Sequence, residues 1–324
     1  MRKKRLIILI TASLIFLLTL VLVIVFNLRS PVLIVAEQAF VGFYGEKRIR
    51  KETLFASITL FRPVKNIFVA NDAGDDIVSL AVSENSSEPF CVIFPLRFVR
   101  AAQVFQRQNP QVPVVILQGR FLENQNLALS SVYRNNSDFL FYKTDITSDF
   151  YRAGLAAAAF DNGKNGTIMI FVCPDIDSSV RNDFIQGVKD YEHRPKSSGR
   201  AQANDDEMEI IGRNTRTHPN TVFFTSFSQF VEVSDLSCVV IIGAGTEYME
   251  KKTDVPVILF TWLDPSLVPD NVVLVVNDSS WAQVVHIVRL WGSEEALGFI
   301  PSKFHFINTK NIDRRVLRKI QKTW

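Results

Sequence analysis

The sequence is poor in the residues from which most catalytic and metal sites are built. It has four histidines among 324 residues, and none of them has a partner at the spacing of a metal site. No G-x-S-x-G motif occurs, so a nucleophile elbow has no support. No pair of carboxylates stands out as a general acid and base. The sequence therefore gives no positive case for an enzyme, and it predicts neither a metal nor a cofactor.

Disulfide bonds and nucleic-acid binding also lack support. The chain has three cysteines, an odd number. Cys91 and Cys238 sit inside apolar runs, which is typical of small buried residues rather than of a disulfide framework. The net charge of +3 includes +4 from residues 2–5, so the rest of the chain has a net charge of −1. Binding phosphates needs a concentrated basic face, so nucleic acid is not an expected partner.

One long hydrophobic run is present. Residues 6–26 contain no charge, and about 20 such residues cross a bilayer as a helix. A cleaved signal is the alternative, but it has an apolar region of roughly 7 to 15 residues and a small-residue cleavage site. The four basic residues before the run favour a cytoplasmic N-terminus. We predict that residues 1–28 are a basic stub and an uncleaved signal anchor. The chain then crosses the cytoplasmic membrane once, with its body on the extracytoplasmic (periplasmic) side.

Short apolar runs alternate with segments of helical spacing along the rest of the chain. The runs are continuous in Val, Ile, Leu and Phe, which is typical of strands buried on both faces of a parallel sheet. Strands are expected at residues 32–36, 67–71, 91–94, 112–117, 139–143, 167–173, 208–211, 238–242, 255–260 and 272–276. Helices are expected at residues 97–108, 147–160, 178–191 and 279–290. This alternation predicts an α/β fold with doubly wound parallel sheets.

The sequence also suggests how the body is divided. We expect a first α/β lobe at 29–143, a second at 144–264, and a return to the first lobe followed by a basic helix at 265–324. Ile312, Val316, Ile320 and Trp324 recur every fourth residue of that helix, expected at 311–324, and basic residues fill most other positions. It either docks on the body with a solvated basic face or lies on an anionic membrane surface.

One glycine motif half-matches a dinucleotide-binding fingerprint. Gly243-Ala-Gly245 follows an apolar run, and Asp264 lies about 20 residues further on, as the fingerprint requires. The third glycine is missing, however, and Tyr248 stands in its place. A tight turn after a strand explains these glycines without a nucleotide.

Several segments taken together resemble a known family. Cys91-Val-Ile-Phe-Pro, a helix and then Gln111-Val-Pro-Val-Val-Ile-Leu are similar to the end of the first domain in type I periplasmic binding proteins. Tyr151-Arg-Ala-Gly-Leu-Ala-Ala and Arg181-Asn-Asp-Phe-Ile-Gln-Gly-Val-Lys, in that order, resemble the second domain. The last segment looks most like the basic membrane protein branch, which includes nucleoside-binding lipoproteins. This chain has a helix in place of the lipobox cysteine of that branch.

The resemblance implies two lobes joined by a hinge, with a small ligand held between them at the carboxyl ends of the strands. It implies a hydrogen-bonding role for Arg181, because a guanidinium donates in a fixed fork. It also implies ligand-contacting carboxylates and aromatic faces that stack on a ring. The predicted site residues are Phe43, Tyr44, Asp145, Arg181, Trp262 and Asp264. Each has a structural alternative: Arg181 paired with Asp177 or Asp183, Asp145 as a helix cap, and the aromatics as core.

The favoured function is a membrane-anchored solute-binding protein that captures a small ligand, a nucleoside or a sugar. It would deliver this ligand to the permease of an ABC transporter or report it to a sensor. The alternative is a binding-protein fold that has lost its ligand and serves as a structural or interaction module.

Overall fold

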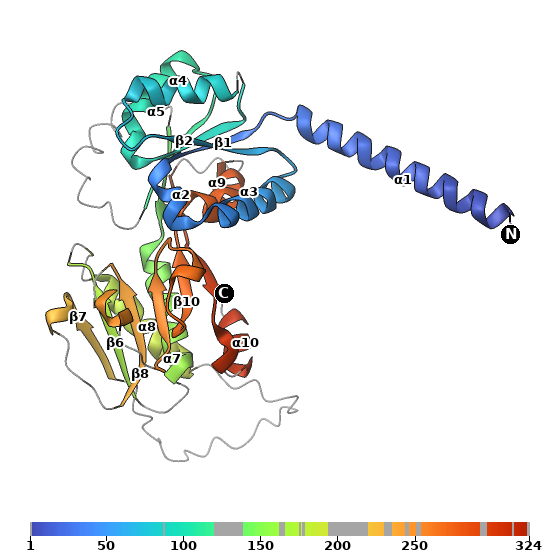
Figure 1. Cartoon of the computed structure of the whole chain (residues 1–324). Helices are drawn as coiled ribbons and strands as arrows, with labels where there is room; N and C mark the ends of the chain where they lie inside the picture. The colour runs from blue at the N-terminus through green and yellow to red at the C-terminus, as the bar shows by residue number, and fades with distance from the viewer. Residues whose placement is uncertain are drawn as a thin grey trace, which may run out of the picture. The chain divides into compact units, whose positions relative to one another are not determined.

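The apolar runs form two separate sheets in the computed structural model of the chain (Figure 1). The structure describes residues 2–86, 88–119, 139–161, 166–174, 176, 179–193, 220–229, 235–243, 246–250, 254–291, 297–312 and 314–322. Within this part, the first unit takes residues 2–119, 139–144 and 279–300, and the second takes 145–278 and 301–322. The described chain therefore passes from one unit to the other at 144/145, 278/279 and 300/301.

The first unit is built on six parallel strands. They are β1 (Val32–Glu37), β2 (Val64–Val69), β3 (Cys91–Pro95), β4 (Val114–Gln118), β5 (Phe139–Thr144) and β11 (Leu297–Ile300). Their order across the sheet is β11-β5-β4-β3-β1-β2, and every neighbouring pair is parallel. Both neighbours of β1 lie in register with it, since Val32 is opposite Val64 and Cys91.

Helices cover both faces of this first sheet. They are α2 (Gln38–Tyr44), α3 (Glu46–Leu60), α4 (Asp75–Asn85), α5 (Val99–Gln108) and α9 (Ser280–Trp291). Helix α3 packs with α9 on one face, and α4 packs with α5 on the other (Figure 1). Strand β1 is buried along its whole length, as expected of a strand covered on both faces.

The second unit repeats the same winding. Its strands are β6 (Thr167–Val172), β7 (Asn220–Phe224), β8 (Leu236–Ile242), β9 (Val257–Phe260), β10 (Val272–Asn277) and β12 (Lys303–Phe306). The order is β12-β10-β9-β8-β6-β7, and β12, antiparallel to β10, is the one strand that breaks the parallel pattern. In both sheets the first strand lies between the second and the third, which is the arrangement of a doubly wound sheet.

The two faces of the second sheet are covered differently. Helices α7 (Ile146–Asp161), α8 (Ser179–His193) and α10 (Arg314–Lys322) share one core with inward-pointing strand residues. Short 3-10 helices cover the other face; one of them, Thr246–Glu250, places Tyr248 in the core. The expected basic helix is thus docked, because Val316 and Ile320 are buried while Arg314 and Arg318 are exposed.

The predicted fold class, two doubly wound α/β lobes after an N-terminal apolar helix, is confirmed. Several details differ from expectation. Strand β2 begins at Val64 rather than at residue 67, and β10 extends the second sheet beyond residue 264. Helices α2, α3 and α4 and strands β7, β11 and β12 were not predicted. The strand expected at 208–211 lies outside the described residues.

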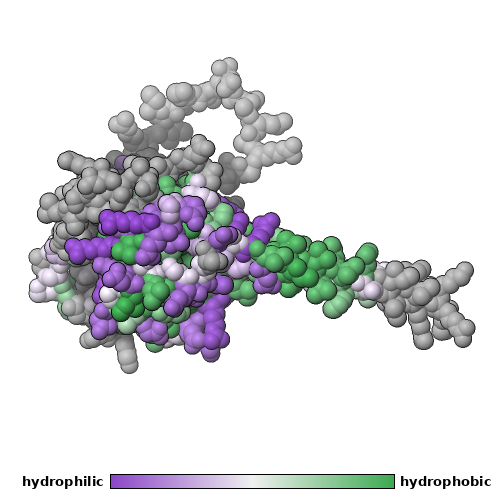
Figure 2. All heavy atoms as spheres, turned by 90° about the horizontal axis from the view of Figure 1, so that it is seen from above, coloured by the Kyte–Doolittle hydropathy of each residue, from purple (hydrophilic) through white to green (hydrophobic). Residues whose placement is uncertain are grey.

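The N-terminal helix α1 spans Arg2–Leu28, and its residues from Thr11 onward are predominantly apolar. Residues Thr11–Leu28 have a mean hydropathy of 2.6, and none of this window is buried inside the protein. Figure 2 shows this stretch as a continuous hydrophobic surface. Among the described residues, α1 is the one helix long and apolar enough to cross a membrane.

Candidate functional site

The doubly wound order creates a switch point in each sheet. In the first sheet it lies between β1 and β3, because α3 follows β1 onto one face while α5 follows β3 onto the other. In the second sheet it lies between β6 and β8. Neighbouring loops diverge at such a point and leave room at the carboxyl ends of the strands, which is where open α/β sheets bind ligands.

An ion pair spans the switch point of the first sheet. Glu37 is the last residue of β1, and Arg97 follows the end of β3 by two residues. The Nη1 atom of Arg97 lies 2.5 Å from Oε1 of Glu37. The Glu37 side chain is 11% exposed and that of Arg97 is 53% exposed. The guanidinium is thus held by a nearly buried carboxylate while it still faces solvent.

Asn71 completes this group from the neighbouring strand end. It follows β2 by two residues, and its backbone carbonyl accepts a hydrogen bond from Nη2 of Arg97. Its side-chain oxygen accepts from the backbone N–H of Ala39, at 3.2 Å. We refer to Glu37, Asn71 and Arg97 as the edge cluster. Three adjacent strands deliver a carboxylate, an amide and a guanidinium to one edge.

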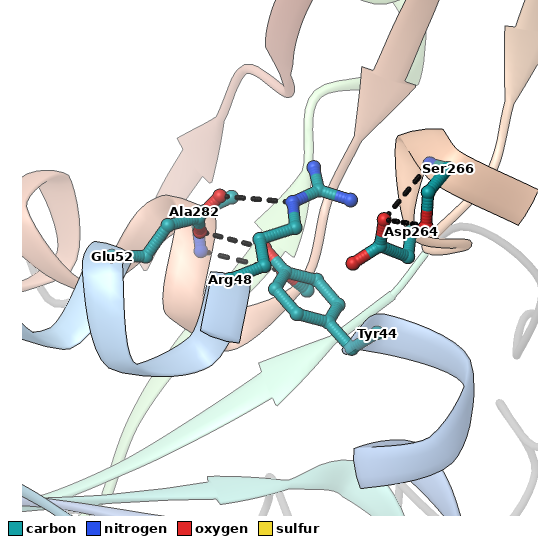
Figure 3. A network of polar contacts seen from close by, with 7 residues as sticks. Tyr44, Arg48, Glu52, Asp264, Ser266 and Ala282 are labelled. Carbon is teal, nitrogen blue, oxygen red and sulfur yellow. Dashed lines mark hydrogen bonds and ion pairs between the residues drawn. The ribbon is translucent and has the colours of Figure 1, made fainter. Parts of the chain in front are cut away.

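The two predicted aromatics of the first unit have different surroundings. Phe43, near the end of α2, is 54% exposed. Tyr44 is buried, and its hydroxyl donates to Oε2 of Glu52 at 2.6 Å and accepts from Ser279 Oγ at 3.0 Å. The Arg48 guanidinium lies 4.4 Å from the Tyr44 ring centre (Figure 3). Burial, followed by the Glu52 charge, raises the pKa of Tyr44 far above its usual range. Tyr44 therefore joins α2, α3 and the start of α9, whereas the Phe43 side chain is open to solvent.

Arg181 lies at the switch point of the second unit. It stands in the first turn of α8, the helix that follows β6. Its Nε is buried and has no hydrogen-bond partner among the described residues, and its guanidinium lies 5.5 Å from the Phe223 ring centre. No described carboxylate pairs with it, including Asp183, and Asp177 lies outside the described residues. A buried donor without a protein partner costs free energy unless something else accepts from it.

The other three predicted residues of the second unit serve local structure. Asp145 accepts from the Ser148 backbone N–H at 3.0 Å and so caps α7. Asp264 accepts from the backbone N–H and the hydroxyl of Ser266, at 2.9 and 2.7 Å, and caps a 3-10 turn (Figure 3). Trp262 donates from its ring nitrogen to the buried Asp278, at 2.5 Å. The capping alternative stated for Asp145 is thus observed, and ligand contact by all three residues stays a prediction.

Sequence reasoning missed the edge cluster, although a signal for it was present. Each member comes at or just after a buried apolar run: Glu37 after Val32–Ala36, Asn71 at the end of the run at 67–71, and Arg97 three residues after Phe94. Gly243, from the glycine motif, directly follows β8 with φ of 70° and bridges to Val172. It thus forms the expected tight turn; Ala244 and Gly245 lie outside the described residues. Within the described part of the chain, no group of His, Cys, Asp and Glu is arranged to hold a metal ion.

No known protein family and no curated protein sequence matches this chain. Solved structures do share its fold. The arabinose-binding protein AraP from Geobacillus stearothermophilus aligns over 88% of this chain and 98% of its own, with 12% identity and a TM-score of 0.52. A transcriptional activator of the comK gene from Bacillus halodurans aligns over 90% and 95%, with 12% identity and a TM-score of 0.51.

A third structure extends this agreement. An ABC transporter solute-binding protein from Conexibacter woesei aligns over 91% of this chain and 94% of its own, with 9% identity and a TM-score of 0.51. These similarities show the fold of type I periplasmic binding proteins over nearly the whole length of each chain. The nucleoside-binding branch stays a prediction.

Proposed function

We propose that this protein is a membrane-anchored, extracytoplasmic solute-binding protein for a small polyhydroxylated ligand of the sugar class. The observation that carries this proposal is the edge cluster at the switch point of the first sheet. The proposed binding surface lies at the carboxyl ends of the strands of the first sheet, where the edge cluster is. A permease of an ABC transporter, or a sensor, would receive the ligand.

The edge cluster has the chemistry that hydroxyl groups require. A hydroxyl both donates and accepts, so it pairs with a carboxylate such as Glu37 and with a guanidinium such as Arg97. The exposed ring of Phe43 offers an apolar face for the C–H face of a sugar. In the second unit, Arg181 lies at the corresponding switch point, and its buried Nε has no hydrogen-bond partner among the described residues. A sugar would satisfy these groups without bringing a net charge.

The structural likeness is consistent with this ligand class. AraP is an arabinose-binding protein, and monosaccharides are therefore the first ligands to test. A nucleoside carries hydroxyls on its ribose and a ring for Phe43, so nucleosides belong in the same panel.

We expect a matching sugar to stabilise the protein and the loss of Arg97 to weaken its binding. At about 100 times its Kd, a ligand adds ~2.7 kcal/mol to the free energy of unfolding. Because Arg97 donates charged hydrogen bonds, Arg97→Ala should weaken binding about ten- to a hundredfold. The affinity of Arg97→Lys should lie between those of the wild type and Arg97→Ala, because lysine keeps the charge but lacks the forked hydrogen-bonding geometry of a guanidinium. Thermal shift of the full chain in detergent, followed by calorimetry, measures both effects.

Arg107→Ala is the matched control, because Arg107 is exposed in the same unit and lies at the far end of α5. It should leave binding unchanged. If Arg107→Ala weakens ligand binding as much as Arg97→Ala does, the edge cluster is not part of the binding site. Silence of the wild-type protein across sugars and nucleosides would favour the second function, an interaction module. That alternative has one observation behind it: Glu37 and Arg97 already satisfy each other.

The proposed anchor rests on the exposed apolar surface of α1. We expect the mature protein to keep Arg2–Arg5 and to stay in the membrane pellet after carbonate extraction. Replacing Leu17 and Val21 by lysine should release the protein from the pellet, because each charge costs about 2.5–3.5 kcal/mol at the bilayer centre. Intact-mass measurement of the membrane-extracted protein checks the N-terminus. A mature chain that begins beyond residue 28 would show a cleaved signal instead.

A further inference from the structure

The outward face of α3 is apolar at its C-terminal end. Leu54, Phe55 and Ile58 are 62%, 58% and 66% exposed, and Phe61, directly after the helix, is 37% exposed. These side chains follow one another at helical spacing, so they share one face. Large apolar side chains that gather on one face of a soluble surface mark an interaction site.

This apolar end of α3 lies beside the point where the chain leaves α1. The Phe61 ring is 6.0 Å from the Phe26 ring, and the Arg29 guanidinium lies 4.8 Å from the Phe61 ring centre. Arg29 also donates to the Phe61 carbonyl at 3.3 Å, and Arg62 donates to the Ser30 carbonyl at 2.8 Å. The exposed apolar face therefore continues from the end of the proposed membrane-spanning helix.

The other half of the same face is basic. Lys47 and Lys51 are exposed, and neither has an ion pair with a described residue. The two neighbouring arginines, by contrast, are paired within the helix: Arg48 with Glu52, and Arg50 with Glu46. Helix α3 thus presents two unpaired lysines followed by a cluster of leucine, isoleucine and phenylalanine.

Apolar exposure alone does not distinguish α3 from α4. Ile77 and Leu80 of α4 are 62% and 58% exposed, but this helix has Asp75, Asp76 and Glu84 and no basic residue. It also covers the opposite face of the first sheet (Figure 1). Charge and position together therefore select α3 as the helix suited to an anionic surface.

We propose that the outward face of α3 lies on the anionic lipid surface next to the anchor. Phe55 and its apolar neighbours enter the headgroup boundary, and Lys47 and Lys51 meet lipid phosphates. This inference rests on the proposed anchoring by α1.

Nitroxide labels in the full chain test this proposal. We would label single cysteines at Phe55→Cys, Leu80→Cys and Val21→Cys in a Cys173→Ser background. The other native cysteines, Cys91 and Cys238, are buried, and burial raises the pKa of Cys91 to about 12, so both resist labelling. The protein is reconstituted in vesicles of phosphatidylglycerol and phosphatidylcholine. Power saturation then compares accessibility to oxygen, which partitions into lipid, with accessibility to a nickel chelate, which stays in water.

Leu80 is a matched control for Phe55, because both are 58% exposed in the same unit. We expect an oxygen-to-nickel ratio at residue 55 severalfold above that at residue 80. In pure phosphatidylcholine, or with Lys47→Glu and Lys51→Glu, the ratio at residue 55 should fall.

Four results would overturn the proposal. If the nickel chelate reaches residue 55 while residue 21 lies in lipid, α3 does not contact the membrane but α1 still anchors the protein. If the nickel chelate reaches residue 21, α1 is not a membrane anchor. Shielding of residue 55 from both agents, with spin–spin broadening, would assign the face to a second copy of the chain. Equal ratios at residues 55 and 80 would show nonselective adsorption.

Discussion

Gly187→Ala is expected to destabilise the second unit by more than about 3 kcal/mol, because the added methyl group has no room. A Cβ at residue 187 would lie 2.1 Å from the backbone oxygen of Tyr151 on α7. The reciprocal contact is as tight: a Cβ at Gly154 would lie 2.2 Å from the backbone oxygen of Phe184 on α8. A backbone atom in a packed helix cannot shift without moving the rest of its helix, so α7 and α8 would have to separate. Native domains are stable by only about 5–15 kcal/mol, so this is a large fraction.

Gly42→Ala is the matched control for this prediction. Gly42 also lies in a helix, α2, but an added Cβ there would meet nothing within 4 Å. Alanine should stabilise that helix by roughly 0.5–1 kcal/mol, because glycine loses more backbone entropy on folding. Denaturant unfolding of the full chain in detergent measures both variants. If Gly187→Ala proves as stable as Gly42→Ala, the close packing of α7 on α8 is wrong.

Asp149→Ala is expected to cost about 3–5 kcal/mol, because it removes one partner of a buried charged group. Asp149 is fully buried, and its carboxylate accepts from the backbone N–H of Ser302 at 2.8 Å and from the Ser302 hydroxyl. Arg152, one turn later on α7, donates to the Ser302 carbonyl at 3.1 Å and lies 4.1 Å from the Phe304 ring centre. Burial lowers the pKa of Arg152, and the Asp149 charge opposes this shift. Alanine would remove the carboxylate to which the Ser302 amide donates, and it would leave the Arg152 charge less compensated.

Asp145→Ala separates this effect from simple capping. Asp145 caps the same helix through one hydrogen bond to Ser148, so its loss should cost about 0.5–2 kcal/mol. Hydrogen exchange at the Ser302 amide adds a local readout, which should accelerate in Asp149→Ala and stay slow in Asp145→Ala. If the two variants lose equal free energies of unfolding, Asp149 does not hold Ser302, near the start of residues 301–322, in place.

The resemblance motifs of the second unit have a packing explanation. Gly154 comes from Tyr151-Arg-Ala-Gly, and Gly187 from Phe184-Ile-Gln-Gly. Each glycine faces the backbone of the other helix, so both motifs reflect the same close contact between α7 and α8. The resemblance was found from the order of the motifs along the chain, and the structure explains why both contain a glycine.

Local sequence signals were weaker in the first unit. Strand β2 is an edge strand with Lys65 and Phe68 exposed between buried positions, so its apolar run begins three residues later than the strand. Helix α3 was missed because Phe55 and Ile58 are apolar yet point outward, which blurs a helical stripe. An apolar residue that faces a membrane or a partner looks like a core residue in a sequence.

The sequence by itself determined the apolar N-terminal helix and the α/β class, because hydrophobic length and hydrophobic periodicity are local properties of a chain. It also placed Arg181 correctly at the start of the helix after β6. Only the tertiary structure decided that β1 lies between β2 and β3, and so brought Glu37, Asn71 and Arg97 together. Residues 37 and 97 are 60 positions apart, and strand order is set by the packing of helices on both faces of a sheet. No local pattern encodes that order, so the edge cluster became visible only in the folded chain.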